Sequence, residues 1–186
     1  MNVYCIMISL NNEAAAMAVV KLLGSLPAKS TTEPIGRASA EEPAVAIDSA
    51  GYIETIAREI ISGLSMTGKI LLRADCRSRF VLPLDKAIPL GLIVGELVTN
   101  AVKYAHPTGV AGIVRIESSR HNGAMVIEIS DDGVGLPEGL DPLAAADAGL
   151  AMIRTLATRL GASISFDNHG LGLSCILRMP YAEVAL

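Results

Sequence analysis

Aromatic side chains and cysteines are scarce in this sequence. Aromatic residues make up 3% of the 186 positions and Trp is absent, whereas 51% of the residues are hydrophobic, so the core has to be built from aliphatic side chains. Cys5, Cys76 and Cys175 are odd in number, far apart and without metal-ligand spacing. This usage argues against a disulfide scaffold or a structural zinc site, and it is typical of reduced thiols in the cytosol.

Long apolar runs and an excess of positive charge are missing as well. The longest apolar runs, residues 14–20 and 88–95, fall well short of the roughly 20 residues that a membrane-spanning helix needs. The opening residues 1–10 lack the basic side chains that begin a signal peptide. Lys and Arg total 15 against 19 Asp and Glu, and the net charge of -4 argues against nucleic acid as a main partner. We therefore expect a cytoplasmic protein without a membrane span.

Composition shifts along the chain predict two parts. Residues 1–26 read as a weakly charged helix whose apolar face suits packing against a partner chain, so a homodimer through this helix is one expectation. That face comprises Ala15, Val19, Leu22 and Leu23. Residues 27–47 are rich in Ala, Ser, Thr, Glu and Pro without periodicity, which predicts a linker. We therefore divide the chain into a helical remnant with its linker, residues 1–48, and one folded domain, residues 49–186.

Hydrophobic periodicity in the second part predicts helices that alternate with hairpins. Helices are expected at 49–64, capped by Ser49, at 83–106, and at 150–160, which Gly161 should end. Pro89 should kink or restart the middle helix near its first turns. Strands are expected at 69–76 with a short partner at 79–82, and at 113–118, 125–130, 162–166 and 171–179. This order predicts an α+β fold, a two-layer sandwich with helices on one face of the sheet.

One predicted helix carries a polar face of mixed chemistry. Within residues 90–106, apolar residues recur at helical spacing, while Glu96, Asn100, Lys103 and Tyr104 lie at i+4 and i+3 steps on another face. Carboxylate and amide oxygens are ligands that Mg2+ prefers beside waters and phosphate oxygens, and Lys103 could steady a phosphate. For any single one of these residues, a solvated helix face with an i,i+4 pair is the simpler interpretation.

The segment DDGVG follows a predicted strand. Asp131 stands where its carboxylate can accept a hydrogen bond from an exocyclic amine such as that of adenine, and Gly133 and Gly135 allow positive φ and close approach of a ligand. An ordinary Asp-Gly hairpin turn is the commoner meaning, but residues 136–139 do not resume a strand. Gly149 begins a predicted helix and could admit a triphosphate there, although taken alone a simple helix entry explains it better.

Taken together, these motifs resemble those of a known family. GLIVGELVTNAVKYAHP, DDGVGLP, AGLAMIRTLATRLGA and GLGLSCILRMP are similar in order and spacing to the N box, first glycine box, second glycine box and closing strand of the sensor histidine kinase ATP-binding domain. The similarity covers residues 49–181 and is greatest to the HWE-related branch. It implies the Bergerat fold of the GHKL ATPases, with a mixed, mainly antiparallel sheet covered by helices on one face, and ATP with Mg2+ as ligands.

The resemblance also implies a role for each matched residue. Asn100 would ligate a Mg2+ ion that bridges the phosphates, and Glu96 would assist the metal or act as the catalytic base. Asp131 would bind the adenine amine, Lys103 would approach a phosphate, and Gly149 would lie at the phosphate end of a lid helix. The nucleotide would also be lined by Tyr104, Gly133, Gly135 and Leu150. The implied chemistry is phosphoryl transfer in two-component signalling, with a response regulator or a histidine-bearing domain as partner.

Two departures from the family pattern keep other functions open. The second glycine box usually reads Gly-x-Gly, whereas Ala151 occupies its last position here. These kinases carry an acceptor histidine on an upstream helical hairpin, but no histidine precedes His106, and His106, His121 and His169 read as surface residues. We therefore expect transfer to a histidine outside this chain, with residues 1–48 as a remnant of the hairpin. The alternatives are a degenerate adaptor or phosphotransfer-type domain that docks a response regulator without turning over ATP, and an anti-sigma-type serine kinase.

Overall fold

A five-stranded sheet forms one layer of the molecule. The computed structural model describes residues 17–22, 46–105, 110–137, 139–142 and 148–181. The strands follow one another in space in the order β2, β4, β5, β7, β6, with β2 parallel to β4 and the other neighbours antiparallel. Their bounds are Ile70–Cys76 (β2), Gly112–His121 (β4), Ala124–Asp131 (β5), Ser163–Asn168 (β6) and Leu173–Pro180 (β7).

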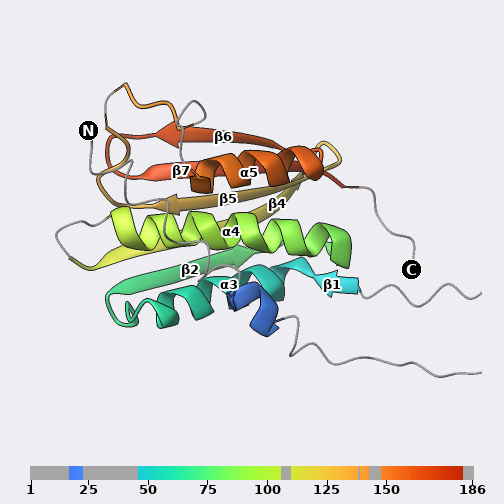
Figure 1. The fold of residues 1–186 in the computed structure, drawn as a ribbon, viewed down its shortest axis with the longest axis horizontal. Helices are drawn as coiled ribbons and strands as arrows, with labels where there is room; N and C mark the ends of the chain where they lie inside the picture. The colour runs from blue at the N-terminus through green and yellow to red at the C-terminus, as the bar shows by residue number, and fades with distance from the viewer. Residues whose placement is uncertain (1–16, 23–45, 106–109, 138, 143–147, 182–186) are drawn as a thin grey trace, which may run out of the picture.

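Three long helices in the described ranges cover one face of this sheet. They are Ser49–Gly63 (α3), Leu84–Tyr104 (α4) and Ala148–Arg159 (α5), and Figure 1 shows α4 between α3 and α5 in front of the strands. The predicted α+β fold, a two-layer sandwich with helices on one face of a mixed and mainly antiparallel sheet, is confirmed. No helix in the described ranges is both long and apolar enough to cross a membrane.

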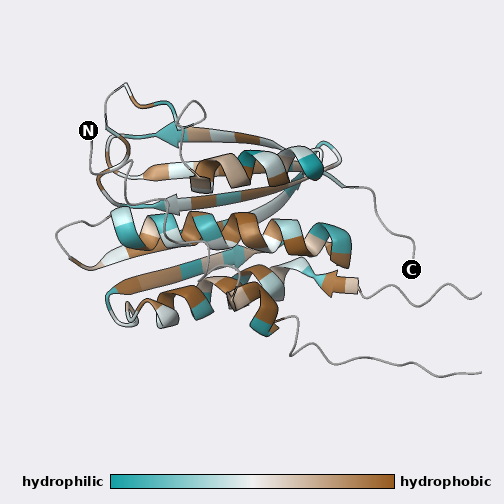
Figure 2. Ribbon diagram, in the orientation of Figure 1, coloured by the Kyte–Doolittle hydropathy of each residue, from teal (hydrophilic) through white to brown (hydrophobic). Residues whose placement is uncertain are grey.

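The core lies between the two layers because each element has one apolar face. In β5, Met125, Ile127 and Ile129 are buried and the residues between them are half-buried, which is the alternation of a strand covered on one side. Figure 2 shows hydrophobic residues along α3, α4 and β2. The turn between β4 and β5 consists of Asn122 and Gly123, whose φ values of 49° and 74° are those of a type I′ hairpin turn.

The helix α4 runs without interruption through Pro89. This residue lies in the second turn, where it removes one backbone hydrogen bond, but it is buried and contributes to the core. The predicted restart at Pro89 is therefore wrong. Gly161 ends α5 as predicted, because its φ of 64° is the left-handed conformation that follows many helices and its N–H donates to the Thr158 carbonyl.

A second, two-stranded sheet lies beside the starts of α3 and α4. It pairs β1 (Ala46–Asp48) with β3 (Val81–Pro83) in antiparallel fashion and places Ile47 opposite Leu82, both of them buried. Two predictions are corrected by this pairing. Residues 79–82 do not pair with β2, because Leu82 finds its apolar partner in Ile47. The linker predicted up to residue 47 also overlaps β1, since Ile47 is buried in a strand.

The residue that caps α3 is not the predicted one. Asp48 Oδ1 accepts a hydrogen bond from the N–H of Ala50 at 3.2 Å, so Asp48 caps α3 in place of Ser49. The Ser49 side chain is fully buried, and its hydroxyl accepts a hydrogen bond from the N–H of Phe80 at 3.2 Å. Ser49 therefore satisfies a buried backbone donor on another segment, which leaves the cap to its exposed neighbour.

The described residues 17–22 are helical and pack on α3. Ala18 and Val19 are buried, and Lys21 Nζ lies 2.5 Å from Glu59 Oε2 on α3. Ala15 and Leu23 of the predicted apolar face lie outside the described residues. This part of the face is thus covered by the same chain, and the homodimer remains a prediction.

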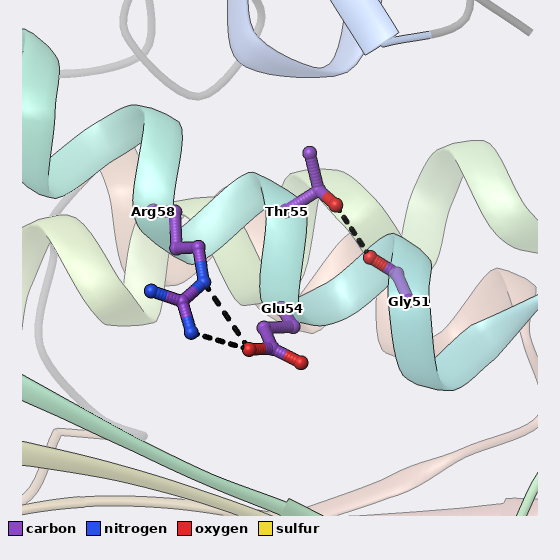
Figure 3. Close-up of polar contacts among 4 residues, drawn as sticks. All are labelled: Gly51, Glu54, Thr55 and Arg58. Atoms are coloured by element: carbon purple, nitrogen blue, oxygen red, sulfur yellow. Dashed lines mark hydrogen bonds and ion pairs between the residues drawn. The ribbon is translucent and has the colours of Figure 1, made fainter.

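The outward face of α3 carries polar contacts within the helix. Figure 3 shows Arg58 reaching Glu54 one turn away, at 2.6 Å, and the Thr55 hydroxyl donating to the Gly51 carbonyl at 2.7 Å. An exposed i,i+4 ion pair such as that of Arg58 and Glu54 stabilises a helix by about 0.3–0.5 kcal/mol. Contacts within one helix are typical of a face that is exposed to solvent, so we do not place the functional site on this face of α3.

Candidate functional site

The end of α4 and the loop after β5 meet at one end of the molecule. The backbone N–H of Val134 donates to the carbonyl oxygen of Ala105 at 2.9 Å. A Cβ atom on Gly133 would lie 2.1 Å from the same oxygen, so the approach requires glycine. The structure therefore brings the end of α4, the helix that carries Glu96, Asn100 and Lys103, into contact with the loop of residues 131–135.

The polar face of α4 is largely withdrawn from solvent. Glu96 is 1% exposed and Tyr104 is 7% exposed, while Asn100 and Lys103 are half-buried. Burial lowers the pKa of the Lys103 ammonium, and the negative charge of Glu96, two turns away along the helix, acts in the opposite direction. A solvated helix face does not explain a buried carboxylate that interacts electrostatically with a half-buried ammonium.

Asn100 presents an oxygen that fits a metal ion. Its Oδ1 atom is buried and has no hydrogen-bond partner among the described residues. A buried acceptor without a donor costs about 1–3 kcal/mol, and a bound cation would remove this cost. No group of three or more His, Cys, Asp or Glu side chains in the described part of the chain could hold a metal ion. An amide oxygen is a ligand that Mg2+ accepts, and this ion usually keeps waters and substrate phosphates as its other ligands, so the unpartnered Oδ1 of Asn100 is chemically suited to it.

Asp131 ends β5 with its carboxylate held by backbone donors. Its Oδ1 atom accepts hydrogen bonds from the N–H of Gly133 at 2.9 Å and the N–H of Leu173 at 3.4 Å. The next residue, Asp132, accepts one from the N–H of Ile113 at 2.7 Å. These contacts fix the direction of the Asp131 side chain before any ligand arrives. A carboxylate held in this way can accept a hydrogen bond from an exocyclic amine.

The two glycines of the loop are required by contacts within the protein. Gly135 has a φ of 67°, and a Cβ atom there would lie 2.4 Å from Asn168 Oδ1. Gly133 does not adopt positive φ. The predicted backbone conformation is therefore confirmed for Gly135 and wrong for Gly133, where the missing side chain makes room for the end of α4.

The connection between β6 and β7 supplies site residues that the sequence analysis missed. The Asn168 side chain bonds the backbone of Leu136, and Gly172, with a φ of 99°, lies so close to the Asp131 carbonyl that a Cβ atom would be 2.1 Å from its oxygen. The segment from Asn168 to Gly172 has the composition of an ordinary turn. Its last three residues open the matched motif GLGLSCILRMP, which was interpreted as a closing strand and not as a contact with the loop after β5.

The predicted phosphate end of the site lies at the start of α5. Gly149 and Leu150 are both buried there, and α5 packs beside α4. Most of the loop that precedes α5, residues 143–147, lies outside the described residues, as does His106. His121 and His169 are exposed, as predicted for surface histidines.

Known proteins with similar sequences are sensor kinases. The family described as histidine kinase-like ATPase domain matches residues 69–179. Blue-light-activated histidine kinase 2 of Erythrobacter litoralis is 30% identical over 102 residues, which cover 54% of this chain and 30% of the relative. Sensor histidine kinase PdtaS of Mycobacterium tuberculosis is 34% identical over 103 residues, which cover 54% of this chain and 21% of the relative. The match thus spans less than a third of either relative.

Solved structures of histidine kinases share the fold. The histidine kinase domain of the EL346 blue-light activated histidine kinase from Erythrobacter litoralis has a TM-score of 0.69 at 24% identity, covering 90% of this chain and 78% of that one. The catalytic domain of histidine kinase ThkA has a TM-score of 0.61 at 17% identity, covering 75% of this chain and 96% of that one. At these identities the likeness concerns the arrangement of helices and strands.

Proposed function

Because this chain belongs to the family of histidine kinase-like ATPase domains, we propose that it is the catalytic domain of a protein histidine kinase. It binds ATP with Mg2+ and transfers the γ-phosphate to a histidine in two-component signalling. The observation that carries this proposal is the hydrogen bond from Val134 to Ala105, because it joins the helix of Asn100 to the loop that begins at Asp131.

Asp131 and the loop after it recognise the base. The Asp131 carboxylate accepts a hydrogen bond from the adenine amine, and the backbone donors of Gly133 and Leu173 hold it in the required direction. Because this orientation exists without ligand, little conformational freedom is lost on binding. Gly135, Tyr104 and Leu150 contribute to the lining of the nucleotide.

The polar face of α4 handles the phosphates. Asn100 offers Oδ1 as a ligand to Mg2+, which when bound neutralises phosphate charge and aligns the γ-phosphoryl group. Lys103 approaches a phosphate oxygen, and Gly149 lies at the phosphate end of α5. Glu96 assists the metal or accepts the proton of the attacking imidazole. The imidazole nitrogen then bonds to the γ-phosphorus while the bond to the β,γ-bridging oxygen breaks and ADP leaves.

The phosphate acceptor is a histidine outside these 186 residues, on another chain or another part of the protein. Of the histidines in this sequence, His121 lies in β4 at the end of the sheet opposite Asp131, and His169 lies in an exposed turn. A response regulator would receive the phosphate from that histidine. The location we propose is the cytoplasm, where ATP and such partners are found.

A degenerate adaptor is the second candidate function, and Ala151 is the observation that favours it. Ala151 lies in the first turn of α5, where the family pattern has a glycine, and its methyl group reduces the space for a phosphate. An adaptor of this kind would dock a response regulator without turning over ATP. Transfer of labelled phosphate from ATP to a histidine-bearing domain separates the two functions, since an adaptor transfers none.

Isothermal titration with ADP, with and without Mg2+, tests nucleotide binding. We expect binding that is tighter with Mg2+, and no heat at millimolar nucleotide would overturn the proposal. Asn100→Asp should remove the Mg2+-dependent increment, because it places a second carboxylate beside Glu96 and alters the metal ligand. Asn122→Asp is the matched control at the far end of the sheet, where Asp tolerates the positive φ, and it should leave the titration unchanged.

Asp131→Asn tests the base end separately. The asparagine oxygen can still accept hydrogen bonds from Gly133 and Leu173, so the loop keeps its shape while the second carboxylate oxygen is lost. We expect nucleotide affinity to fall about 10- to 100-fold both with and without Mg2+, the effect of losing a hydrogen bond to a charged group. Unchanged affinity in both Asp131→Asn and Asn100→Asp would mean that the nucleotide binds elsewhere.

A further inference from the structure

The loop after β5 is held at its far end by one side chain. Asn168, the last residue of β6, accepts a hydrogen bond from the N–H of Leu136 at 3.2 Å through Oδ1 and donates one to the Leu136 carbonyl at 3.0 Å through Nδ2. Two antiparallel strands exchange the same pair of bonds between opposed residues. The Asn168 amide therefore takes the place of a neighbouring strand for a segment that has left the sheet.

The same connection also holds the near end of the loop. The N–H of Leu173, the first residue of β7, donates to Asp131 Oδ1, and Gly172 lies against the Asp131 carbonyl. Between these anchors, the absence of a side chain at Gly135 leaves the space that Asn168 Oδ1 occupies. Residues 168–173 thus contact both Asp131, where the loop begins, and Leu136, where it turns away.

Asn168 is exposed, so its bonds contribute little to the stability of the whole domain. Their effect is local, because a loop without regular structure pays conformational entropy for each residue that is fixed. A contact that fixes both backbone groups of Leu136 restricts the loop before a ligand arrives. Restriction of this kind raises affinity by lowering the entropy cost of binding.

We propose that Asn168 is a positioning residue of the nucleotide site, which clamps Leu136 so that the loop starting at Asp131 is already shaped for the base. This inference rests on the function proposed above. It assigns to the β6–β7 connection a role in nucleotide binding that neither glycine motif contains. The clamp acts through the loop, and Asn168 itself need not touch the nucleotide.

Titration of the full chain with ADP and Mg2+ tests the clamp. Asn168→Ala should weaken ADP binding about tenfold, equivalent to ~1.4 kcal/mol, while the melting temperature of the ligand-free protein stays close to that of the wild type. Asn168→Asp is nearly isosteric, yet it should also weaken binding, because an oxygen then faces the Leu136 carbonyl. Ser165→Ala, an exposed position on the same strand, is the matched control and should bind ADP as the wild type does.

Amide hydrogen exchange at Leu136 in the ligand-free protein separates positioning from a general structural role. We expect exchange at Leu136 to accelerate at least about tenfold in Asn168→Ala and to stay unchanged in Ser165→Ala, since Asn168 Oδ1 is the acceptor of this N–H within the described part of the chain. If both Asn168 variants bind ADP within twofold of the wild type, the inference about Asn168 is overturned and the proposed function is not. Failure of the wild type to bind ADP would overturn the proposed function, and with it the role of Asn168.

Discussion

The two ends of the sheet are closed in different ways. At the end where β3 pairs with β1, the Phe80 and Tyr181 rings meet edge to face, with centroids 4.8 Å apart, and the Arg120 guanidinium lies 5.6 Å from the Phe80 centroid and 5.2 Å from the Tyr181 centroid. At the other end, Gly133 and Val134 meet the last turn of α4 through backbone atoms. We call these the packed end and the site end.

This difference separates stability from ligand binding. A large buried ring contributes strongly to the free energy of folding, and at the packed end the fully buried Phe80 ring, just before β3, meets the half-buried Tyr181 ring, just after β7, and Arg120 of β4. The site end places glycines where side chains would pack, and it keeps a buried oxygen of Asn100 without a partner among the described residues. We infer that substitutions at the packed end change stability first, whereas those at the site end change nucleotide affinity first.

Phe80→Ala should give the largest effect of the substitutions considered. The side chain is fully buried, so its removal leaves a cavity and deprives Tyr181 and Arg120 of their ring contact. We expect the free energy of unfolding to fall by about 3–5 kcal/mol, measured by urea denaturation. ADP affinity of the folded protein should remain within twofold of the wild type. A tenfold loss of affinity at unchanged stability would break the division between the two ends.

Tyr181→Phe is a milder variant of the same end. It keeps the ring and removes the hydroxyl that accepts a hydrogen bond from the N–H of Val81 at 3.1 Å. The loss should be about 1–3 kcal/mol because the Val81 donor is part-buried and would be left unsatisfied. A loss as large as that of Phe80→Ala would show that the hydrogen bond matters more than the packing of the rings.

Gly133→Ala should have a smaller effect on stability and a larger one on binding. The new Cβ atom would lie 2.1 Å from the Ala105 carbonyl oxygen, so the loop has to move away from α4. We expect a stability loss of about 1–3 kcal/mol, as for other overpacked contacts, together with a loss of ADP affinity measured by titration. Wild-type affinity in this variant would show that the contact between the loop and α4 is not needed for binding.

Gly51→Ala is the matched control for this substitution. Gly51 lies inside α3 with nothing within 4 Å of the position its Cβ would take. Alanine is favoured over glycine in a helix by about 1 kcal/mol, so this variant should be more stable than the wild type. ADP affinity should be unchanged, because α3 contributes no residue to the proposed site.

Sequence periodicity predicted the elements better than it predicted their partners. The strand expected at 125–130 is observed as Ala124–Asp131, since alternation is a local property of the chain. The partner of β3 was wrong because the burial of Leu82 against Ile47 depends on a contact far along the sequence. The prediction of Ser49 as the helix cap is wrong for the same reason, because its hydroxyl accepts a hydrogen bond from the N–H of Phe80, which lies far along the sequence.

For the candidate site, too, local patterns were predicted and contacts between distant residues were not. Helical spacing placed Glu96, Asn100 and Lys103 on one face, and the DDGVG segment after a predicted strand indicated Asp131. The resemblance to a family then joined the two segments in one nucleotide site. Asn168 was missed because its contact with Leu136 joins residues 32 positions apart and leaves no periodic trace. The identity of a side chain that satisfies a distant backbone group is set by the tertiary structure, which local patterns do not record.

Tyr52→Phe should change the free energy of unfolding least. It compares a buried, unpaired oxygen outside the proposed site with that of Asn100 inside it. The Tyr52 hydroxyl is buried without a hydrogen-bond partner among the described residues, as Asn100 Oδ1 is at the site end. Removing the hydroxyl should raise the free energy of unfolding by about 1 kcal/mol and leave ADP affinity unchanged. Equal stability of both proteins at pH 7 would mean that the hydroxyl is satisfied by water.

The same substitution also changes the response to alkali. Burial raises the pKa of Tyr52 from 10.0 to about 12 in the folded protein. Between pH 10 and pH 12 the folded protein keeps the Tyr52 proton, whereas the unfolded chain releases it. Titration of Tyr52 therefore leaves the free energy of unfolding unchanged below pH 10 and lowers it as the pH rises toward 12. Urea denaturation at pH 9 and 11 should show a smaller loss in Tyr52→Phe than in the wild type. Tyr52 lies on α3, which contributes no residue to the proposed site, so removal of its unpaired hydroxyl should stabilise the protein without a functional cost.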